Sequence, residues 1–333
     1  MCKSNHFQTM NQKITDEKYM RRCLQLARNG IHSARPNPMV GCVIVVPQGQ
    51  SASGKACETE CGGRIIGEGY HIRCGEGHAE VNAFASVRPA DEHLLPQATV
   101  YVSLEPCSHY GKTPPCADLI VSKHVRRVVV GTVDPFAKVQ GRGIDRLRQA
   151  GIDVTVGVLE QECRELNKRF FTFHQQHRPY IILKWAQTAN GYLDDNFHPL
   201  AISTPFTQML SHRLRADEDA IVVGRVTDER EHPALTVRHW SGRNPRRFVL
   251  SKDYSIEQLV NDCLAGNIQS LIVEGGAKTH ESFIDADLWD EIRVETAPVT
   301  VKRGTEACPL PPNIVVKSRE VYDQNVIITY QRT

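Results

Sequence analysis

The segment His78-Ala79-Glu80-Val81-Asn82-Ala83, followed by Glu105-Pro106-Cys107 and later by Pro115-Cys116, contains one imidazole, two thiols and a spare carboxylate. A catalytic zinc ion takes three protein ligands and keeps a fourth position open for water. A nearby base must also move the protons of that water. We therefore predict that His78, Cys107 and Cys116 hold zinc and that Glu80 transfers protons.

The spacing of these residues constrains the local structure. His78 and Glu80 are two positions apart, which is about 200° around a helix, so both reach one metal only if the helix points its first turn at it. Cys116 follows two prolines and opens the next predicted helix, where the helix dipole favours a thiolate. Any one of these side chains, considered alone, would more often be a buried residue of the core than a zinc ligand. All four in this order are typical of zinc deaminases that act on nucleobase rings, and three ligands disfavour a purely structural zinc.

Length and composition predict two domains without a membrane segment. The chain has 333 residues, of which 41% are hydrophobic and 23% charged, and a net charge of +2 gives no support for a nucleic-acid partner. No apolar run approaches 18 residues and the first 13 residues lack a secretory pattern, so we expect a cytoplasmic protein. Eleven cysteines, an odd number, argue against a disulfide framework. Cys57 and Cys61 lie in a polar insertion over 48–63, where we expect exposed thiols, since two ligands do not make a second zinc site.

The first half alternates strands and helices, which is typical of a layered α/β domain. We predict a helix over 16–29 with Thr15 as its N-cap, and strands over 40–46 and 64–71 that form a hairpin across the insertion. The remaining predicted elements are helices over 78–87, 117–123, 143–149 and 160–176, and strands over 98–104, 127–132 and 154–158.

A polar segment that ends in Pro179 marks the predicted boundary, so the domains are expected to span 1–176 and 177–333. The second half repeats the α/β pattern. Its predicted strands cover 180–187, 220–225, 247–250, 270–274, 291–295, 313–316 and 325–330, and its predicted helices cover 207–215, 256–264 and a segment from Gly276 toward 288.

Eight residues separate Cys107 from Cys116, whereas nucleic-acid deaminases commonly have two between their cysteines. The intervening Ser-His-Tyr-Gly-Lys-Thr-Pro-Pro resembles the deaminase half of the bifunctional deaminase–reductases of riboflavin biosynthesis. Segments 36–41 (Pro-Asn-Pro-Met-Val-Gly), 78–83, 105–109 and 131–135 are similar to motifs of that family, and the resemblance covers nearly the whole chain.

This resemblance implies a cytidine-deaminase-like three-layer α/β/α domain. It implies that zinc-dependent hydrolysis replaces the 2-amino group of a diaminopyrimidinone ribosylamino 5′-phosphate by oxygen. Asn37 would then contact the substrate, and its alternative role is that of a turn residue between prolines. His109 and Lys112 face either the substrate phosphate or solvent.

The second half by itself carries weaker signals. Gly275-Gly276 lies between a predicted strand and helix, where backbone N–H groups can approach a phosphate or simply form a tight turn. Arg215 and Arg238 are candidate phosphate-binding arginines or solvated charges. The absence of a G-x-G-x-x-G segment argues against a Rossmann dinucleotide site.

Segments 182–184, 233–238 and 273–276 resemble the reductase half of the same family, which has a dihydrofolate-reductase-like α/β fold and uses NADPH to reduce the ribosyl group to a ribityl group. The resemblance implies that the substrate contacts Lys184, Arg215, Leu235, Arg238 and Glu274. It implies that NADPH contacts Ala186, Thr227, Glu231, Gly276, Ala277, Lys278, Thr279, His280, Glu281 and Ser282.

Several positions depart from the family pattern, namely Asn190, Pro199, Ala201, Glu231 and His232. They leave open a deaminase whose reductase half no longer reduces. A nucleic-acid-editing deaminase and a zinc-stabilised binding module are further alternatives. The family also implies a homo-oligomer, a dimer or a tetramer.

Overall fold

A computed structural model describes residues 2–47, 62–109, 114–136 and 140–333, with side chains from residue 10 onward. Residues 48–61 of the predicted insertion, with Cys57 and Cys61, lie outside the described residues, and so does Lys112. Contacts between residues divide the chain into two compact units, Met1–Gln175 and Gln176–Thr333. No helix among the described residues combines the length and apolar character needed to cross a membrane.

The N-terminal unit is a three-layer α/β/α sandwich, as predicted. Its five-stranded sheet has the order β2-β1-β3-β4-β5, in which β1 pairs antiparallel with β2 and β3 while β3, β4 and β5 are parallel. The strands are β1 (Gly41–Val46), β2 (Arg64–Tyr70), β3 (Thr99–Leu104), β4 (Arg127–Thr132) and β5 (Asp153–Val156).

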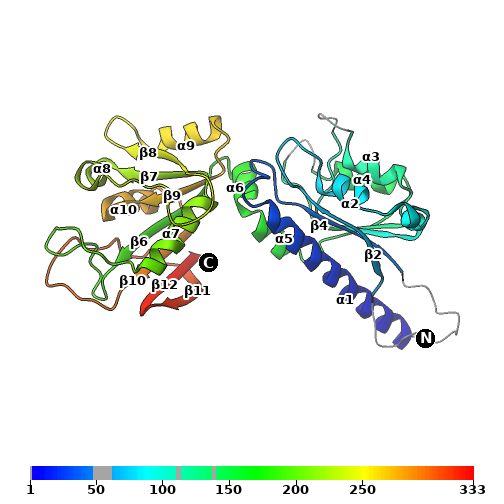
Figure 1. The fold of residues 1–333 in the computed structure, drawn as a ribbon, viewed down its shortest axis with the longest axis horizontal. Helices are drawn as coiled ribbons and strands as arrows, with labels where there is room; N and C mark the ends of the chain where they lie inside the picture. Colours follow the sequence, from blue (N-terminus) through cyan, green and yellow to red (C-terminus); the bar gives the residue numbers. More distant parts are fainter. Residues whose placement is uncertain (1, 48–61, 110–113, 137–139) are drawn as a thin grey trace. The chain divides into compact units, whose positions relative to one another are not determined.

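Alternate strand residues build two cores, one on each face of this sheet. One core joins the sheet to α2 (Ala79–Ala85), α3 (Cys116–Ser122) and α4 (Arg142–Gln149). The other joins it to α1 (Cys2–Ala27) and α5 (Glu160–Leu166). Figure 1 shows α1 running along its face of the sheet. The short 3-10 segments Arg28–Gly30 and Pro89–Gln97 lie in the connections.

The predicted helices over 16–29 and 160–176 differ most from the structure. α1 begins at Cys2, so Thr15 is inside the helix, where its hydroxyl donates to the carbonyl of Asn11 at 2.9 Å. The predicted helix over 160–176 is broken at Asn167 into α5 and α6 (Lys168–Gln176). The Asn167 side chain accepts from Met39 N at 2.8 Å and donates to Met39 O at 2.9 Å. This double contact ties the helix break to the segment that carries Asn37.

The C-terminal unit is a seven-stranded mixed sheet with the order β11-β12-β10-β6-β9-β7-β8. Strands β10, β6, β9, β7 and β8 run parallel, and β12 and β11 add antiparallel at one edge. The strands are β6 (Tyr180–Gln187), β7 (Ala220–Gly224), β8 (Arg246–Leu250), β9 (Ser270–Glu274), β10 (Glu291–Thr296), β11 (Ile314–Tyr322) and β12 (Asn325–Arg332).

Helices cover both faces of this sheet (Figure 1). The larger core contains side chains of α9 (Ile256–Ala265) and α10 (Ala277–Asp285), while Leu214 of α7 (Pro205–Asp217) packs into the smaller one. A further helix, α8 (Arg225–Glu231), follows β7, and the sequence did not predict it. None of its residues is buried, so no apolar periodicity marked it.

Candidate active sites

Two helix starts and one loop bring the predicted zinc ligands together. His78 is the N-cap of α2 with an extended backbone, Cys116 is the first residue of α3, and Cys107 follows β3. His78 Nδ1 lies 3.5 Å from Cys107 Sγ and 3.4 Å from Cys116 Sγ, and all three ligand atoms lie within 4.8 Å of one another. The helices therefore point end-on at one place.

These three side chains fit a zinc ion. In a tetrahedral site, bonds of about 2.3 Å to sulfur and about 2.0 Å to nitrogen place the two ligand atoms about 3.5 Å apart. The Cys116 N–H donates to Cys107 Sγ at 3.3 Å. A hydrogen bond with the Cys116 thiol lowers the pKa of Cys107 to about 4 and raises that of Cys116. One of the two sulfurs is thus readily available as a thiolate.

Glu80 lies beside this cluster in the first turn of α2 and is 3% exposed. Burial raises the pKa of its carboxyl to about 7, while the nearby His78 acts in the opposite direction. A carboxyl group with a pKa near the working pH exchanges protons in both directions, which is what a general acid–base needs.

Sequence reasoning missed His71, which orients Asn37. Asn37 Nδ2 lies 3.1 Å from His71 Nε2, and His71 Nδ1 lies 3.2 Å from the carbonyl of Gly77. With the amide as donor, Nε2 accepts and Nδ1 donates, so the ring is neutral; burial lowers the pKa of His71, consistent with this. The ring also meets that of His78 edge-on at 5.3 Å. No periodic pattern distinguishes His71, because it lies just after β2 in an irregular segment.

Glu105, one residue before Pro106, holds the neighbouring loop. Its 4%-exposed carboxylate accepts four backbone N–H groups, at distances of 2.9 to 3.3 Å, from Asp134, Gly141, Gly143 and Ile144. A Cβ on Gly143 would lie 1.9 Å from the carbonyl of Pro106, so only glycine allows this approach. Glu105 thereby fixes the backbone that carries Cys107.

We expect Glu105→Gln to lower the free energy of unfolding by about 2 kcal/mol, because an NH2 group replaces one acceptor oxygen and leaves buried N–H groups unpaired. Urea denaturation of the full chain would measure this. Glu92→Gln, at an exposed position, is the control and should change stability by less than about 0.5 kcal/mol. Equal stabilities of the two variants would contradict the role of Glu105.

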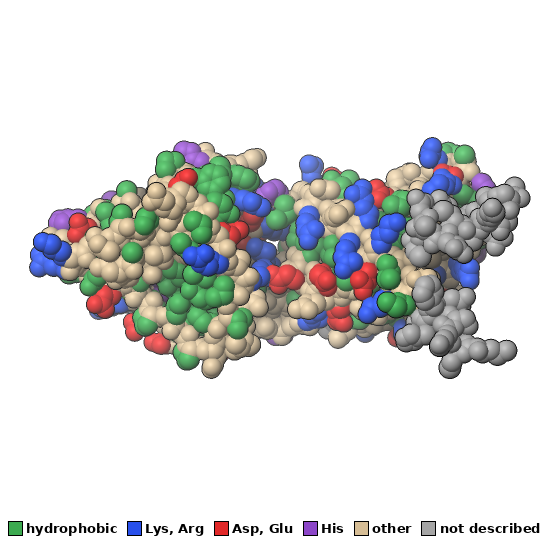
Figure 2. Space-filling model, turned by 90° about the horizontal axis from the view of Figure 1, so that it is seen from below, with side chains coloured by type: hydrophobic (Ala, Val, Ile, Leu, Met, Phe, Trp, Pro, Cys, Tyr) green, Lys and Arg blue, Asp and Glu red, His purple; other side chains and the backbone are tan. Residues whose placement is uncertain are grey.

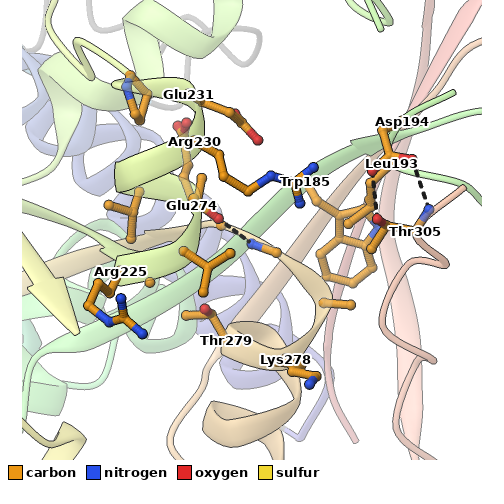
Figure 3. A pocket seen from close by; sticks show the side chains of 18 of the residues that line it. Trp185, Leu193, Asp194, Arg225, Arg230, Glu231, Glu274, Lys278, Thr279 and Thr305 are labelled. Carbon is orange, nitrogen blue, oxygen red and sulfur yellow. Dashed lines mark hydrogen bonds between the residues drawn. The ribbon is translucent and has the colours of Figure 1, made fainter. Parts of the chain in front are cut away.

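The C-terminal unit contains a pocket of about 940 Å³ where the parallel strands β6, β7, β8 and β9 end. This edge of a parallel sheet is where ligands commonly bind. Figure 3 shows Arg225, Arg230 and Glu231 of α8 on one side and Trp185, Asp194 and Thr305 on the other.

One wall of this pocket is suited to a phosphate. Gly276 is the N-cap of α10, and its N–H donates to Thr227 Oγ1 at 3.2 Å. Gly224, at the end of β7, lies close to the first turn of α10: a Cβ at this glycine would lie 2.5 Å from Thr279 Oγ1. Helix N-termini with accessible N–H groups favour anions. The residues predicted to contact NADPH that line the pocket are Ala186, Thr227, Glu231, Gly276, Ala277, Lys278, Thr279 and Ser282.

His280 and Glu281 are not among the lining residues. His280 is fully buried beneath Trp185, with a ring separation of 5.0 Å and Nε2 at 3.2 Å from the carbonyl of Val273. Burial lowers its pKa to about 4, so it is a neutral core residue. Glu281, one residue further along α10, is exposed.

The predicted substrate residues divide into two groups. Lys184, Leu235 and Glu274 line the pocket, whereas Arg215 and Arg238 do not. Arg215 forms a two-point pair with Glu274, at 3.1 and 2.7 Å, so its guanidinium already has a partner. Burial alone would raise the pKa of Glu274, but Lys184 and Arg215 keep it below its ordinary value. Glu274 is therefore a carboxylate held in place by Arg215.

The two units match different family models. Residues 13–132 match the cytidine and deoxycytidylate deaminase zinc-binding region, and residues 179–263 and 253–324 match the RibD C-terminal domain. The riboflavin biosynthesis protein RibD of Aquifex aeolicus is 33% identical over 93% of this chain and 95% of that protein. RibD of Actinobacillus pleuropneumoniae is 39% identical over 98% and 97%. The chain belongs to the RibD family.

A solved RibD-family structure agrees with both units. It comes from Thermotoga maritima and is described as a diaminohydroxyphosphoribosylaminopyrimidine deaminase/5-amino-6-(5-phosphoribosylamino)uracil reductase. It is 30% identical, covers 97% of this chain and 100% of its own, and has a TM-score of 0.85. Like other RibD proteins, this chain joins a zinc-binding deaminase domain to a reductase domain.

Two of the five positions that depart from the family pattern line the reductase pocket. Pro199 and Glu231 line the pocket, and His232 ends α8 with a left-handed backbone. Asn190 lies outside the lining and bonds to Val301 at 2.8 Å. Ala201 also does not line the pocket. The match to the RibD C-terminal domain does not favour the alternative of a degenerate reductase half.

The structure also adds pocket residues that the sequence did not predict. They include Asp194, Phe197, Arg225, Arg230 and Thr305. They lie in loops or in α8, where neither periodicity nor a motif indicated a function.

Proposed function

We propose that this RibD-family chain performs two consecutive reactions on a phosphorylated pyrimidine. The first is hydrolytic deamination of 2,5-diamino-6-ribosylamino-4(3H)-pyrimidinone 5′-phosphate in the N-terminal unit. The second is NADPH-dependent reduction of the ribosyl group to a ribityl group in the C-terminal unit. The observation that carries the proposal is the His78, Cys107 and Cys116 cluster with buried Glu80 beside it.

In the deaminase site, His78, Cys107 and Cys116 would hold the zinc ion, which supplies Lewis acidity for the addition of water to the ring carbon. Glu80 takes the proton that water loses on addition and gives it to the adjacent ring nitrogen. Glu80 then moves the proton of the added hydroxyl group to the departing amino group. The amino group leaves as ammonia, and the hydroxyl oxygen becomes the carbonyl oxygen. Asn37, oriented by His71, hydrogen-bonds the pyrimidine.

In the reductase pocket, bound NADPH would supply a hydride to the sugar carbon of the open-chain substrate, in which that carbon is joined to nitrogen by a double bond. The N–H groups at the start of α10 and the Thr227 hydroxyl suit the dinucleotide phosphates. Lys184 would supply the proton that the nitrogen of this double bond takes up when the sugar carbon accepts the hydride. Arg215 acts through Glu274, which it holds in the lining of the pocket. Zinc ligation, NADPH use and a cytoplasmic location stay predictions.

The test is an assay on purified, zinc-loaded protein with the diaminopyrimidinone phosphate, analysed by mass spectrometry with and without NADPH. Deamination without NADPH and a ribityl product with it would support both halves. Deamination that stops there in the presence of NADPH would reject the reductase activity. An unchanged substrate would reject the deaminase activity.

We further propose that the chain forms a homo-oligomer through the β11–β12 face of the C-terminal unit. β11 is the edge strand of its sheet, and its residues Val315, Val316 and Val321 are 41% to 58% exposed. Phe206 of α7 is 41% exposed, and its ring lies 5.1 Å from that of Tyr322 at the end of β11. Figure 2 shows hydrophobic side chains gathered on this unit. Exposed apolar patches commonly mark protein interfaces.

Sedimentation equilibrium should give at least twice the chain mass of 37.4 kDa. Val316→Glu combined with Val321→Glu should shift the protein to the monomer, because charges oppose burial of this face. A monomeric wild type at micromolar concentration would contradict the proposal.

A further inference from the structure

A strained turn borders the reductase pocket. Asp195 and His198 exchange two backbone hydrogen bonds, at 3.1 and 2.9 Å, around Asn196 and Phe197. Both central residues have positive φ angles, 50° and 65°. A two-residue hairpin with this backbone strongly prefers glycine, asparagine or aspartate. Asn196 fits that preference, but a bulky side chain at the second position is unfavourable.

Neighbouring residues hold Phe197 in this conformation. Arg230 donates to the Phe197 carbonyl at 2.9 Å, and the Phe197 N–H donates to Asp194 Oδ1 at 3.2 Å. The Asp194 carboxylate also accepts from the N–H and hydroxyl of Thr305, at 2.8 and 2.6 Å (Figure 3). Asn196 N donates to the carbonyl of Arg303 at 2.8 Å. Such strain persists only where the surroundings enforce it, and it commonly accompanies function.

The Phe197 side chain contributes little to a core. The residue is 52% exposed and lines the pocket. An aromatic ring that keeps an unfavourable backbone without the benefit of burial is best explained by a ligand. Aromatic side chains contact planar heteroaromatic rings through stacking or edge-to-face packing.

The order of the strands in the sheet indicates which ring of a bound dinucleotide would lie near Phe197. The turn follows β6, the phosphate-binding start of α10 follows β9, and the lining residues Leu250 and Ser251 lie at the end of β8. β6 and β8 lie on opposite sides of β9, and adjacent strands are about 4.8 Å apart. A dinucleotide with its phosphates at α10 extends one ring toward β6 and the other toward β8.

We propose that Phe197 is the aromatic contact for the nicotinamide ring of NADPH, an inference that rests on the proposed reductase function. The adenosine then lies toward β7 and β8. Since the ring contact depends on the backbone of Phe197, Arg230 and Asp194 are positioning residues for it. The side chain, rather than the turn, provides the binding energy.

The test separates the ring from the rest of the dinucleotide. Phe197→Gly in the full-length protein should raise the Kd of NADPH about tenfold, because the variant loses the aromatic contact with the nicotinamide ring. The Kd of 2′-phospho-ADP-ribose, which lacks nicotinamide, should not change. The melting temperature should stay the same or rise, because glycine adopts the left-handed backbone without strain. Titration calorimetry and thermal unfolding measure all three quantities.

Two variants serve as controls. Gln324→Gly lies at the corresponding position of the Asp323-Gln324 turn between β11 and β12, where φ is 74°. It should relieve the same kind of strain without changing either Kd. Phe197→Tyr should retain NADPH binding because it retains the ring.

Other outcomes overturn the inference. Unchanged NADPH affinity in Phe197→Gly excludes the contact, and an equal loss for both ligands excludes the nicotinamide as its partner. A raised KM for the pyrimidine substrate alone would assign Phe197 to that ring instead. A wild type that binds neither dinucleotide would reject the proposed NADPH site itself.

Discussion

Replacing Glu80 by glutamine should lower the deaminase turnover number by at least about a hundredfold while leaving zinc bound. General acid–base groups contribute about 10² to 10⁴-fold, and an amide has the same shape but transfers no proton. Because burial already raises the pKa of Glu80 to about 7, its site tolerates an uncharged side chain, and the fold should persist. Ammonia release and metal content, measured on the same preparation, would check this prediction.

Glu76→Gln is the matched control, since Glu76 lies four residues earlier and is exposed. It should keep full activity. If Glu80→Gln retained wild-type turnover, Glu80 would not be the proton shuttle. If it lost zinc, the residue would act as a ligand or a structural group instead. A wild type that holds zinc but releases no ammonia would instead favour the alternative of a zinc-stabilised binding module.

Replacing Cys116 by alanine should reduce bound zinc from one ion per chain to near zero and abolish deamination. Two remaining ligands do not hold zinc in competition with a chelator, because catalytic sites need three. The reductase activity on the already deaminated substrate should remain within about twofold. The reason is that the two units have separate hydrophobic cores. Elemental analysis and the two separate assays measure these effects.

Cys74→Ala provides the control, because Cys74 is exposed and lies outside the His78, Cys107 and Cys116 cluster. It should retain zinc and both activities. Loss of the reductase in Cys116→Ala would contradict independent units, and retained zinc in that variant would contradict the assigned ligand set.

The sequence alone was sufficient to predict those strands and helices that are marked by a local pattern of apolar and polar residues. Buried strands such as β4 and β6 were predicted to the residue, because continuous apolar runs between polar segments report burial on both faces. The zinc cluster was predictable for a related reason. His78 and Cys116 lie at helix starts, Cys107 and Cys116 each follow a proline, and metal coordination admits few kinds of side chain.

Other features were decided by partners distant in sequence. Asn167 divides a predicted helix because Met39, 128 residues away, bonds its side chain. The sequence left Arg215 as either a phosphate-binding arginine or a solvated charge, and it could not show that Glu274, 59 residues away, pairs with it. Periodicity carries no information on such pairs, because it reports burial and not which polar group lies opposite.

The sequence by itself thus predicted most of the strands and helices, the clustering of His78, Cys107 and Cys116, and the family resemblance. The tertiary structure decided which of the predicted residues reach the reductase pocket, that Glu105 anchors the Cys107 loop, and that Phe197 borders the pocket in a strained turn. The physical reason is that local patterns follow from backbone geometry and burial. Hydrogen-bond partners and pocket walls depend instead on the order in which strands pair, which only the folded chain establishes.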